Sequence, residues 1–317
     1  MNKVCFLIVW FGKWPSFFDL FLNSCSYQTG IDFYFISDNV LPDNVSKNVK
    51  WKYMSLTDFN AIASYRTNAK INVARGYKIC DLKPAWCHIF EDVLLEYEYV
   101  GYCDIDLVFG DILSFIEPLT SGKVDLYTVT DAYCSGATTL FRNTPEMRVL
   151  YRKAKSWQMI FEDSENYAFD EMLLPSKRDS GYDTFSDVVK NEELTNGLKV
   201  YWGHDIMLEI RPISVIVYDK GHVHYCDKEW IAFHYVIAKN KIFWTFPKWK
   251  EIPSLYLIGK YGFYLNENKP ISKFQLLYNN DYRSQIYKTI MNKSRRLYDF
   301  IRRCSLSTFI DEIRRQF

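Results

Sequence analysis

The sequence predicts an α/β protein whose central sheet is covered on both faces by helices. Residues 3–10 form a continuous apolar run of strand length, residues 16–26 place apolar side chains at helical spacing, and residues 31–36 form a second apolar run. Strands that are apolar throughout and joined through a helix are typical of parallel strands with both faces buried. The opening of the chain therefore indicates a strand–helix–strand unit.

The same two criteria assign most of the remaining chain, with short apolar runs predicting strands and apolar side chains every three or four residues predicting helices. Further strands are predicted at residues 49–54, 99–103, 126–130 and 138–141. Further helices are predicted at residues 57–63, 84–97 and 145–161. Residues 230–236 and 242–246 are predicted to form a hairpin, whereas residues 162–200 are polar and irregular and receive no element.

Composition excludes several classes of protein. The chain has 317 residues and a formal net charge of +1, from 39 Lys and Arg against 38 Asp and Glu. Nucleic-acid-binding proteins normally carry a basic excess, so we expect no nucleic-acid partner. Hydrophobic residues at 48% and charged residues at 24% are typical of a folded domain and not of a disordered chain. Aromatic residues reach 18%, and most of these rings are expected in the core.

The charge is unevenly distributed along the chain. Residues 281–317 contain nine Lys or Arg and four Asp or Glu, so they carry +5 while the first 280 residues carry −4. Within this basic stretch, apolar side chains recur at helical spacing, as in helices that lie on anionic membranes. We therefore expect a folded domain over residues 1–262 and a basic amphipathic helical tail over residues 263–317. Contact with an anionic membrane and packing against the folded domain both agree with this pattern.

The cysteines and the N-terminus indicate a cytoplasmic protein. Eight cysteines are scattered along the chain without a Cys-x-x-Cys pair, and reduced thiols are expected in a chain of this length without a secretion signal. The first apolar run is followed by Gly-Lys-Trp-Pro and not by a small-residue cleavage site, so it is predicted to be a strand. No stretch approaches 18 uncharged apolar residues, so no membrane span is predicted.

The most informative motif is Asp104-Ile-Asp106, which follows the apolar strand predicted at residues 99–103. In α/β proteins ligands bind at the carboxyl ends of strands, where the loops converge. Two carboxylates with a single residue between them can point to the same side and share one hard cation, Mg²⁺ or Mn²⁺. Such a cation typically bridges a substrate diphosphate. A pair of solvated acids in a turn would give the same pattern.

An ordered set of motifs around this pair resembles the bacterial glycosyltransferases of the GT-A fold, above all a group found in capsule and O-antigen gene clusters. The set comprises residues 77–84 (YKICDLKP), a helix, and residues 101–111 (GYCDIDLVFGD). It continues with FISDN at 35–39, LFRN at 140–143 and FDE at 169–171, and the resemblance covers roughly residues 3–245. It implies a mixed α/β sheet flanked by helices, and transfer of a hexose from a nucleotide-sugar, a UDP-sugar, to a glycan or lipid-linked acceptor.

The resemblance also implies a metal centre. Asp104 and Asp106 would bind the Mn²⁺ or Mg²⁺ ion that holds the nucleotide diphosphate, and Asp104 would also reach the ribose or donor sugar. In several retaining enzymes of this fold a late His is the third metal ligand, followed by Gly and then by Lys that binds phosphate. His234 matches the first role and Lys239 or Lys241 the last, although Ile237 stands where Gly is expected. A core histidine among aromatic neighbours would give the same pattern.

The remaining candidate residues also follow from the resemblance. Asp170 and Glu171 would face the acceptor or donor sugar, as a general base in an inverting enzyme or as a stabilising group in a retaining one. Asp205 is a further acid of the same kind. The residues expected to hold the nucleotide-sugar are Arg75, Asp81, Lys83 and, near the base and ribose, Asp38.

Two other functions agree with parts of the pattern. Asp104-Ile-Asp-Leu-Val108 also matches the nucleophile motif of haloacid-dehalogenase-type phosphatases, in which Asp104 would attack phosphate. That motif normally lies on the first strand, whereas about a hundred residues precede it here. A non-catalytic glycan-binding protein of the same fold is the third possibility. His222 and His224, alternate residues on a predicted strand, are a rival pair of metal ligands.

Overall fold

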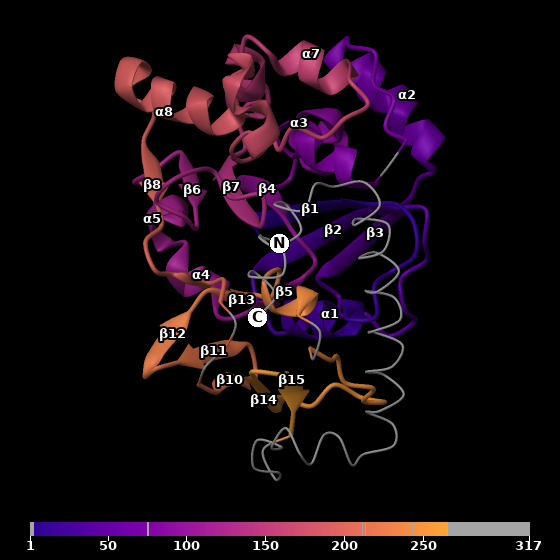
Figure 1. The fold of residues 1–317 in the computed structure, drawn as a ribbon, viewed down its shortest axis with the longest axis vertical. Coiled ribbons are helices and arrows are strands. Elements are labelled where there is room, and N and C mark those ends of the chain that lie inside the picture. Colours follow the sequence, from indigo (N-terminus) through magenta and orange to yellow (C-terminus); the bar gives the residue numbers. More distant parts are fainter. Residues whose placement is uncertain (1–2, 75, 211, 213, 242–243, 266–317) are drawn as a thin grey trace, which may run out of the picture.

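The computed structural model describes residues 3–265, except residues 75, 211, 213 and 242–243. The described chain forms a mixed sheet flanked by helices, with two smaller sheets towards one end of the molecule (Figure 1). The α/β class expected from the sequence is confirmed.

The main sheet has the strand order β3-β2-β1-β4-β7-β6-β8. Its strands are β1 (Val4–Trp10), β2 (Ile31–Ser37), β3 (Val49–Tyr53), β4 (Tyr99–Cys103), β6 (Leu126–Thr128), β7 (Thr138–Arg142) and β8 (Val200–Trp202). The first four are parallel to one another, and β7 is antiparallel to both β4 and β6. The central strands β1 and β4 therefore have their carboxyl ends at the same edge.

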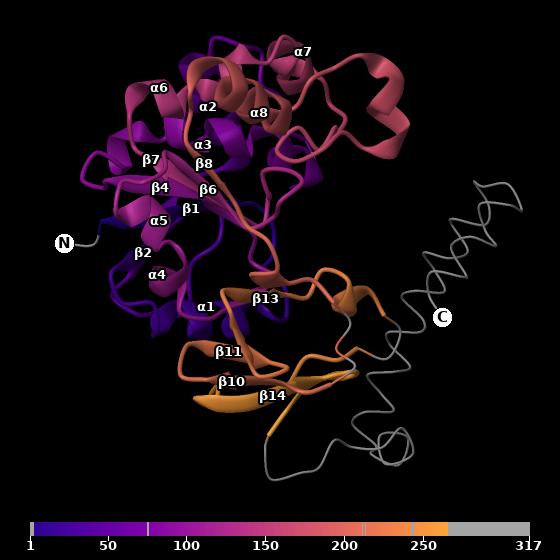
Figure 2. The same ribbon diagram turned by 90° about the vertical axis from the view of Figure 1, so that its left-hand side faces the viewer.

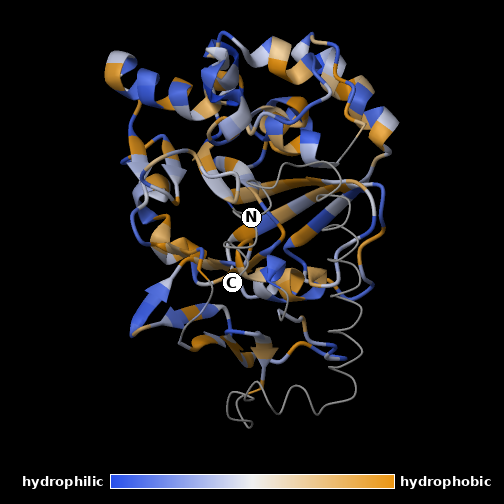
Figure 3. Ribbon diagram, viewed as in Figure 1, coloured by the Kyte–Doolittle hydropathy of each residue, from blue (hydrophilic) through white to orange (hydrophobic). Residues whose placement is uncertain are grey.

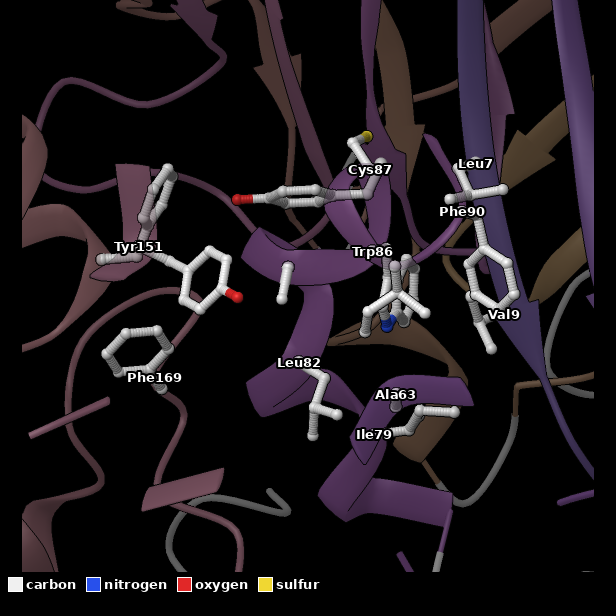
Figure 4. Close-up of a cluster of buried hydrophobic side chains, with 14 of the residues drawn as sticks. Leu7, Val9, Ala63, Ile79, Leu82, Trp86, Cys87, Phe90, Tyr151 and Phe169 are labelled. Atoms are coloured by element: carbon white, nitrogen blue, oxygen red, sulfur yellow. The ribbon is translucent and has the colours of Figure 1, made fainter. Parts of the chain in front are cut away.

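Strand β1 is apolar throughout because both of its faces are buried. Alternate side chains point to opposite faces of a strand, and Leu7 and Val9 pack with Trp86 and Phe90 on one side (Figure 4). Phe6, on the other side, packs against α1. Burying a side chain of this size stabilises the fold by about 1.5–3 kcal/mol.

Helices cover both faces of this sheet. Helix α1 (Phe18–Ser26) buries Phe18 and Phe21 on one face, and α2 (Leu56–Thr67) and α3 (Lys83–Ile89) cover the other. Four shorter described helices are α4 (Ile112–Phe115), α5 (Glu117–Thr120), α6 (Pro145–Arg148) and α7 (Trp157–Glu162), whereas α8 (Phe185–Asn196) is as long as α2.

Two further sheets lie beyond α1 (Figure 2). A three-stranded sheet has the order β5-β13-β9, with β5 (Leu107–Phe109), β9 (Met207–Leu208) and β13 (Ala232–His234). A five-stranded antiparallel sheet has the order β12-β11-β10-β14-β15, with β10 (Ile216–Asp219), β11 (His222–Tyr225), β12 (Lys228–Trp230), β14 (Leu255–Gly259) and β15 (Gly262–Tyr264). Strand β5 of the three-stranded sheet begins directly after Asp106. Its pairing with β13 therefore connects the Asp104-Ile-Asp106 segment to the C-terminal part of the described chain.

The hairpin predicted from residues 230–236 and 242–246 is wrong. The first stretch divides into β12 and β13, and β13 pairs with β5 on one edge and β9 on the other, so both of its edges are occupied. Thr245 forms an isolated bridge with Gly262 instead. A hairpin was expected because the two stretches are close in sequence. The strand that pairs with β13 is instead the apolar stretch Leu107–Phe109, which lies far earlier in the chain.

The helix predicted at residues 145–161 is interrupted. Between α6 and α7 lie a 3₁₀ turn, Leu150–Lys153, and an extended residue, Ala154. The backbone N–H groups of Lys155 and Ser156 donate to the Asp183 carboxylate, which breaks the helical hydrogen-bond series from outside. Helix α3 likewise ends at Ile89, well before residue 97.

The polar stretch 162–200, which received no element, contains α8. Thr184 and Asp187 form a reciprocal capping box at its start, and Gly197, at φ 71°, ends it in the left-handed conformation that favours glycine. These capping residues are visible in the sequence. The helix has a weakly apolar face, however, so its apolar residues recur only weakly at helical spacing.

The expected division at residue 262 stays a prediction. Strand β15 crosses that position, and the basic tail lies outside the described residues from residue 266 onward. Among the described residues, no helix combines the length and apolar character needed to cross a membrane. The seven described cysteines are all free thiols.

Gly101 in β4 provides a test of how tightly the sheet is packed. A Cβ atom built there would lie 1.9 Å from the Thr139 carbonyl oxygen of β7, so Gly101→Ala must push two central strands apart. We expect a loss of about 2–3 kcal/mol in the free energy of unfolding, measured by urea denaturation. Gly76→Ala is the control, because a Cβ there meets nothing within 4 Å. Equal stability of the two variants would contradict the described register.

Candidate functional site

Asp104 and Asp106 lie at the carboxyl end of β4, in the centre of the main sheet. Strand β4 ends at Cys103, and the two acids occupy the short connection to β5. The Asp104 backbone N–H donates to the Ala137 carbonyl oxygen at 3.1 Å, which ties the connection to the neighbouring strand. The Asp106 side chain is 9% exposed and that of Asp104 is 31% exposed. One carboxylate is therefore buried and the other opens to solvent.

The pairing of β5 with β13 brings His234 to these acids. His234 is opposite Leu107 in the antiparallel register, next to Asp106 in sequence. Its Nε2 atom lies 3.3 Å from Asp106 Oδ1 and 3.9 Å from Asp104 Oδ2. Ligand atoms of the three residues all lie within 4.8 Å of one another. Two residues adjacent in sequence and one from far along the chain thus form a compact group of metal-ligating side chains.

Glu209 orients the His234 ring. Its Oε1 atom lies 2.5 Å from His234 Nδ1, and Glu209 reaches this position because β9, which it follows, runs parallel to β13. The opposite ring nitrogen, Nε2, is buried and has no hydrogen bond of acceptable geometry. A carboxylate that accepts the Nδ1 proton leaves the Nε2 lone pair available, which is the arrangement of metal-binding histidines. Sequence reasoning missed Glu209, since no motif surrounds it.

The charges of the group are balanced by protons and by Lys239. Burial lowers the pKa of His234, but the neighbouring Asp106 and Glu209 carboxylates outweigh this and raise it to about 10. Burial raises the pKa of Asp106, but His234 and Lys239 together hold it below its usual value. The raised pKa favours the protonated form of His234, and its positive charge balances the Asp104 and Asp106 carboxylates, as the charge of a metal ion would.

Lys239 contacts Asp106 from the other side. It lies in the 3₁₀ turn Ala238–Asn240, just after β13, and its Nζ atom is 2.5 Å from Asp106 Oδ2. Lys241 follows that turn, and its expected role stays a prediction. The structure therefore favours Lys239 as the lysine of the site.

Lys83 joins the metal group to a second pair of acids. It is the first residue of α3, its side chain is 4% exposed, and its Nζ donates to Asp104 Oδ1 at 2.7 Å and to the Gly136 carbonyl oxygen at 3.0 Å. The same Nζ lies 3.3 Å from Asp170 Oδ2. Lys83, expected to bind the donor, is thus held by two carboxylates and a carbonyl group and links Asp104 to Asp170.

Asp170 and Glu171 lie close to Gly136. The Gly136 N–H donates to Glu171 Oε1 at 2.7 Å, and a Cβ at Gly136 would lie 2.4 Å from Asp170 Oδ2. A larger residue there would displace the ends of the Asp170, Lys83 and Glu171 side chains. Burial raises the pKa of both acids above their usual values, against the lowering effect of Lys83. Asp170 is buried and Glu171 is half-buried, so Glu171 is the more accessible of the two.

Asp81 anchors the backbone of the segment that precedes Asp170. It has no exposed surface, and its carboxylate accepts hydrogen bonds from the backbone N–H groups of Tyr167 and Phe169 and from Lys78. Phe169 lies in the same core as α3 (Figure 4). The expectation that Asp81 binds donor hydroxyls is therefore corrected, because both of its oxygens hold the segment that precedes Asp170.

The other expected residues are distributed more widely. Asp38 is exposed after β2 and accepts from the Gly12 N–H at 2.9 Å, so it ties two loops at the edge of the sheet. Asp205 is exposed beside His204 and makes no described contact with the site. His222 and His224 lie on β11, in a separate group from Asp104. Arg75 lies outside the described residues.

Replacing Glu209 tests its action through His234. In Glu209→Gln the side chain keeps its size but loses its charge, so the imidazole is held less firmly in the tautomer that leaves Nε2 free. We expect Mn²⁺ affinity, measured by calorimetric titration, to fall about 10–100-fold. Glu193→Gln is the control, since Glu193 also accepts a ring N–H, from Trp202 at 2.9 Å, outside the site. Unchanged Mn²⁺ affinity in Glu209→Gln would contradict this role.

Comparison with known proteins gives a family without a described activity. No curated protein matches the chain. Among solved structures, the galactosyltransferase LgtC, determined in complex with donor and acceptor sugar analogues, is 11% identical over 65% of this chain and 74% of its own, with a TM-score of 0.33. A likeness of this extent is too low to carry a conclusion. A model of the family of unknown function DUF6625 matches residues 6–244, so the chain belongs to that family.

Proposed function

We propose that this protein is a metal-dependent glycosyltransferase of the GT-A fold, which transfers a hexose from a UDP-sugar to a glycan or lipid-linked acceptor. The observation that carries the proposal is the convergence of the His234 Nε2 atom on the Asp104 and Asp106 carboxylates at the carboxyl end of β4, with ligand atoms of all three residues within 4.8 Å of one another. Two carboxylates and an imidazole brought this close together match the ligand set of a divalent cation. A bound cation would neutralise the two carboxylates.

These two carboxylates and one imidazole fit a divalent metal ion that accepts both oxygen and nitrogen ligands. Two carboxylates suit Mg²⁺ and Mn²⁺, whereas the imidazole nitrogen is less suited to Mg²⁺, which prefers oxygen ligands. We therefore favour Mn²⁺ held by Asp104, Asp106 and His234. When bound, the ion would neutralise the charge that develops on the leaving nucleoside diphosphate.

The chain's own residues complete the proposed site. Lys239, in contact with Asp106, places a second positive charge beside the position proposed for the diphosphate. Lys83 fixes Asp104 and Asp170 relative to each other. Glu171, held by the Gly136 N–H, is the acid best placed to meet a sugar hydroxyl, because Asp170 is more deeply buried. It would deprotonate the acceptor in an inverting reaction or stabilise the donor in a retaining one.

The biological setting is proposed from the sequence. A basic, amphipathic tail agrees with a cytoplasmic enzyme that works at the inner membrane surface on a lipid-linked acceptor of a bacterial surface polysaccharide. The tail lies outside the described residues, so this setting rests on the residue pattern alone.

Release of UDP from UDP-sugars in the presence of Mn²⁺ tests the proposed activity. Asp106→Asn removes a buried ligand charge, so we expect UDP release, followed by a coupled assay, to fall at least about 100-fold. Asp111→Asn is the control, because Asp111 follows the same motif without belonging to the group of ligands. It should retain full activity.

Two outcomes would select the other functions. Phosphate release from phosphomonoesters without UDP-sugar turnover, lost in Asp104→Asn, would favour the phosphatase. Binding of glycans without turnover of any UDP-sugar would favour a non-catalytic lectin-like protein.

A further inference from the structure

A second group of metal-ligating side chains lies on the five-stranded sheet. His222 and His224 of β11 and Glu229 of β12 place ligand atoms within 4.8 Å of one another, and both histidines are exposed. We propose that these three residues form a second metal site, which binds a borderline transition-metal ion of the Zn²⁺ class. This inference does not depend on the proposed glycosyltransferase activity.

The strand register places the three side chains on one face. His222 and His224 are alternate residues of β11, so they point to the same side, and the buried Val223 between them points to the core. Glu229 is directly opposite His224 in the antiparallel register. The histidine rings lie 6.2 Å apart between centroids with an interplanar angle of 17°, and His222 Nδ1 lies 2.6 Å from Glu229 Oε1.

Two tight turns fix this register. Residues 220–221 join β10 to β11, and residues 226–227 join β11 to β12. All four residues of these turns have positive φ, between 46° and 89°, as two-residue hairpin turns of type I′ require. A slip of one residue would move His222 and His224 to the core face, so the turns hold the ligands where a metal ion can approach.

The donor set differs in kind from the one at Asp104. Two imidazole nitrogens and one carboxylate oxygen are ligands that Zn²⁺ prefers, and they select against Mg²⁺ and Ca²⁺. Within the described part of the chain, no hydrogen bond or ion pair holds His224, so its ring can turn towards an ion at the cost of its stacking on His222. Asp219 of β10 is opposite His222 and exposed, and it or a water molecule would supply a fourth ligand.

A bound ion would clamp the edge of the sheet. Strand β12 is an edge strand, short and hydrophilic (Figure 3), and it is joined to β11 by three residue pairs. Ligands on both strands would add a cross-link between them. The proposed role is therefore structural, and it predicts that Zn²⁺ raises the melting temperature of the protein.

Zinc titration of the full-length chain tests the site. In an Asp106→Asn background, which disables the first group of ligands, we expect one Zn²⁺ equivalent in competition with a chromophoric chelator at pH 7.5. Adding His224→Ala should weaken this Zn²⁺ binding at least about 10-fold and abolish the Zn²⁺-dependent rise in melting temperature. His222→Ala should act in the same way.

His204→Ala is the matched control, because His204 is also exposed and paired with a carboxylate, at 2.9 Å from Asp131, but has no second histidine beside it. It should leave Zn²⁺ affinity unchanged. The melting temperature without metal should be the same in all variants, which shows that each one folds. Zn²⁺ binding that is equally strong with and without His222 and His224, or that never exceeds the weak binding of a surface histidine, would overturn the proposal.

Discussion

The pairing of β5 with β13 is the interaction on which the candidate site depends. Leu107, Val108 and Phe109 follow directly after Asp106, and all three are buried against the strand that ends at His234. Because β13 has β9 on its other edge, the same three-stranded sheet also delivers Glu209. Apolar packing thus brings polar side chains together from three distant parts of the chain. The free-energy cost of burying their charges is offset by the hydrophobic contacts of the neighbouring strand residues.

Lys83 controls the electrostatics of the interior. A buried ammonium group is costly unless it is paired, and this one lies between Asp104, Asp170 and the Gly136 carbonyl. Because Lys83 contacts both acids, Asp104 and Asp170 belong to one network. Lys83 is the first residue of α3, so the start of this helix lies beside the end of β4.

The sequence predicts the parts of the structure that depend on local patterns. The apolar runs of β1, β2 and β4 and the Asp-x-Asp motif after β4 are local, and they predicted that Asp104 and Asp106 follow a central strand, where the structure has them. Glu209 and Gly136 could not be found in this way, since their importance comes from strand pairing and from a close approach of side chains. The hairpin at residues 230–246 was wrong for the same reason. Helix α8 is marked in the sequence by its capping residues Thr184 and Gly197, but it was missed because its apolar residues recur only weakly at helical spacing.

The hydrogen bonds of Asp81 have a consequence for how the chain can vary. They hold the backbone at Tyr167 and Phe169, and the capping box at Thr184 holds the start of α8, so the acids at 170–171 are held from both sides. The mostly exposed segment between them, residues 172–183, is held to the body by Asp183, which fixes the start of α7, and by an ion pair between Lys177 and the exposed Glu165. Chain could be added or removed within residues 175–181 at small entropic cost while the acids stay in place. This segment is therefore where a surface of different shape and charge could be grafted beside an unchanged group of acids.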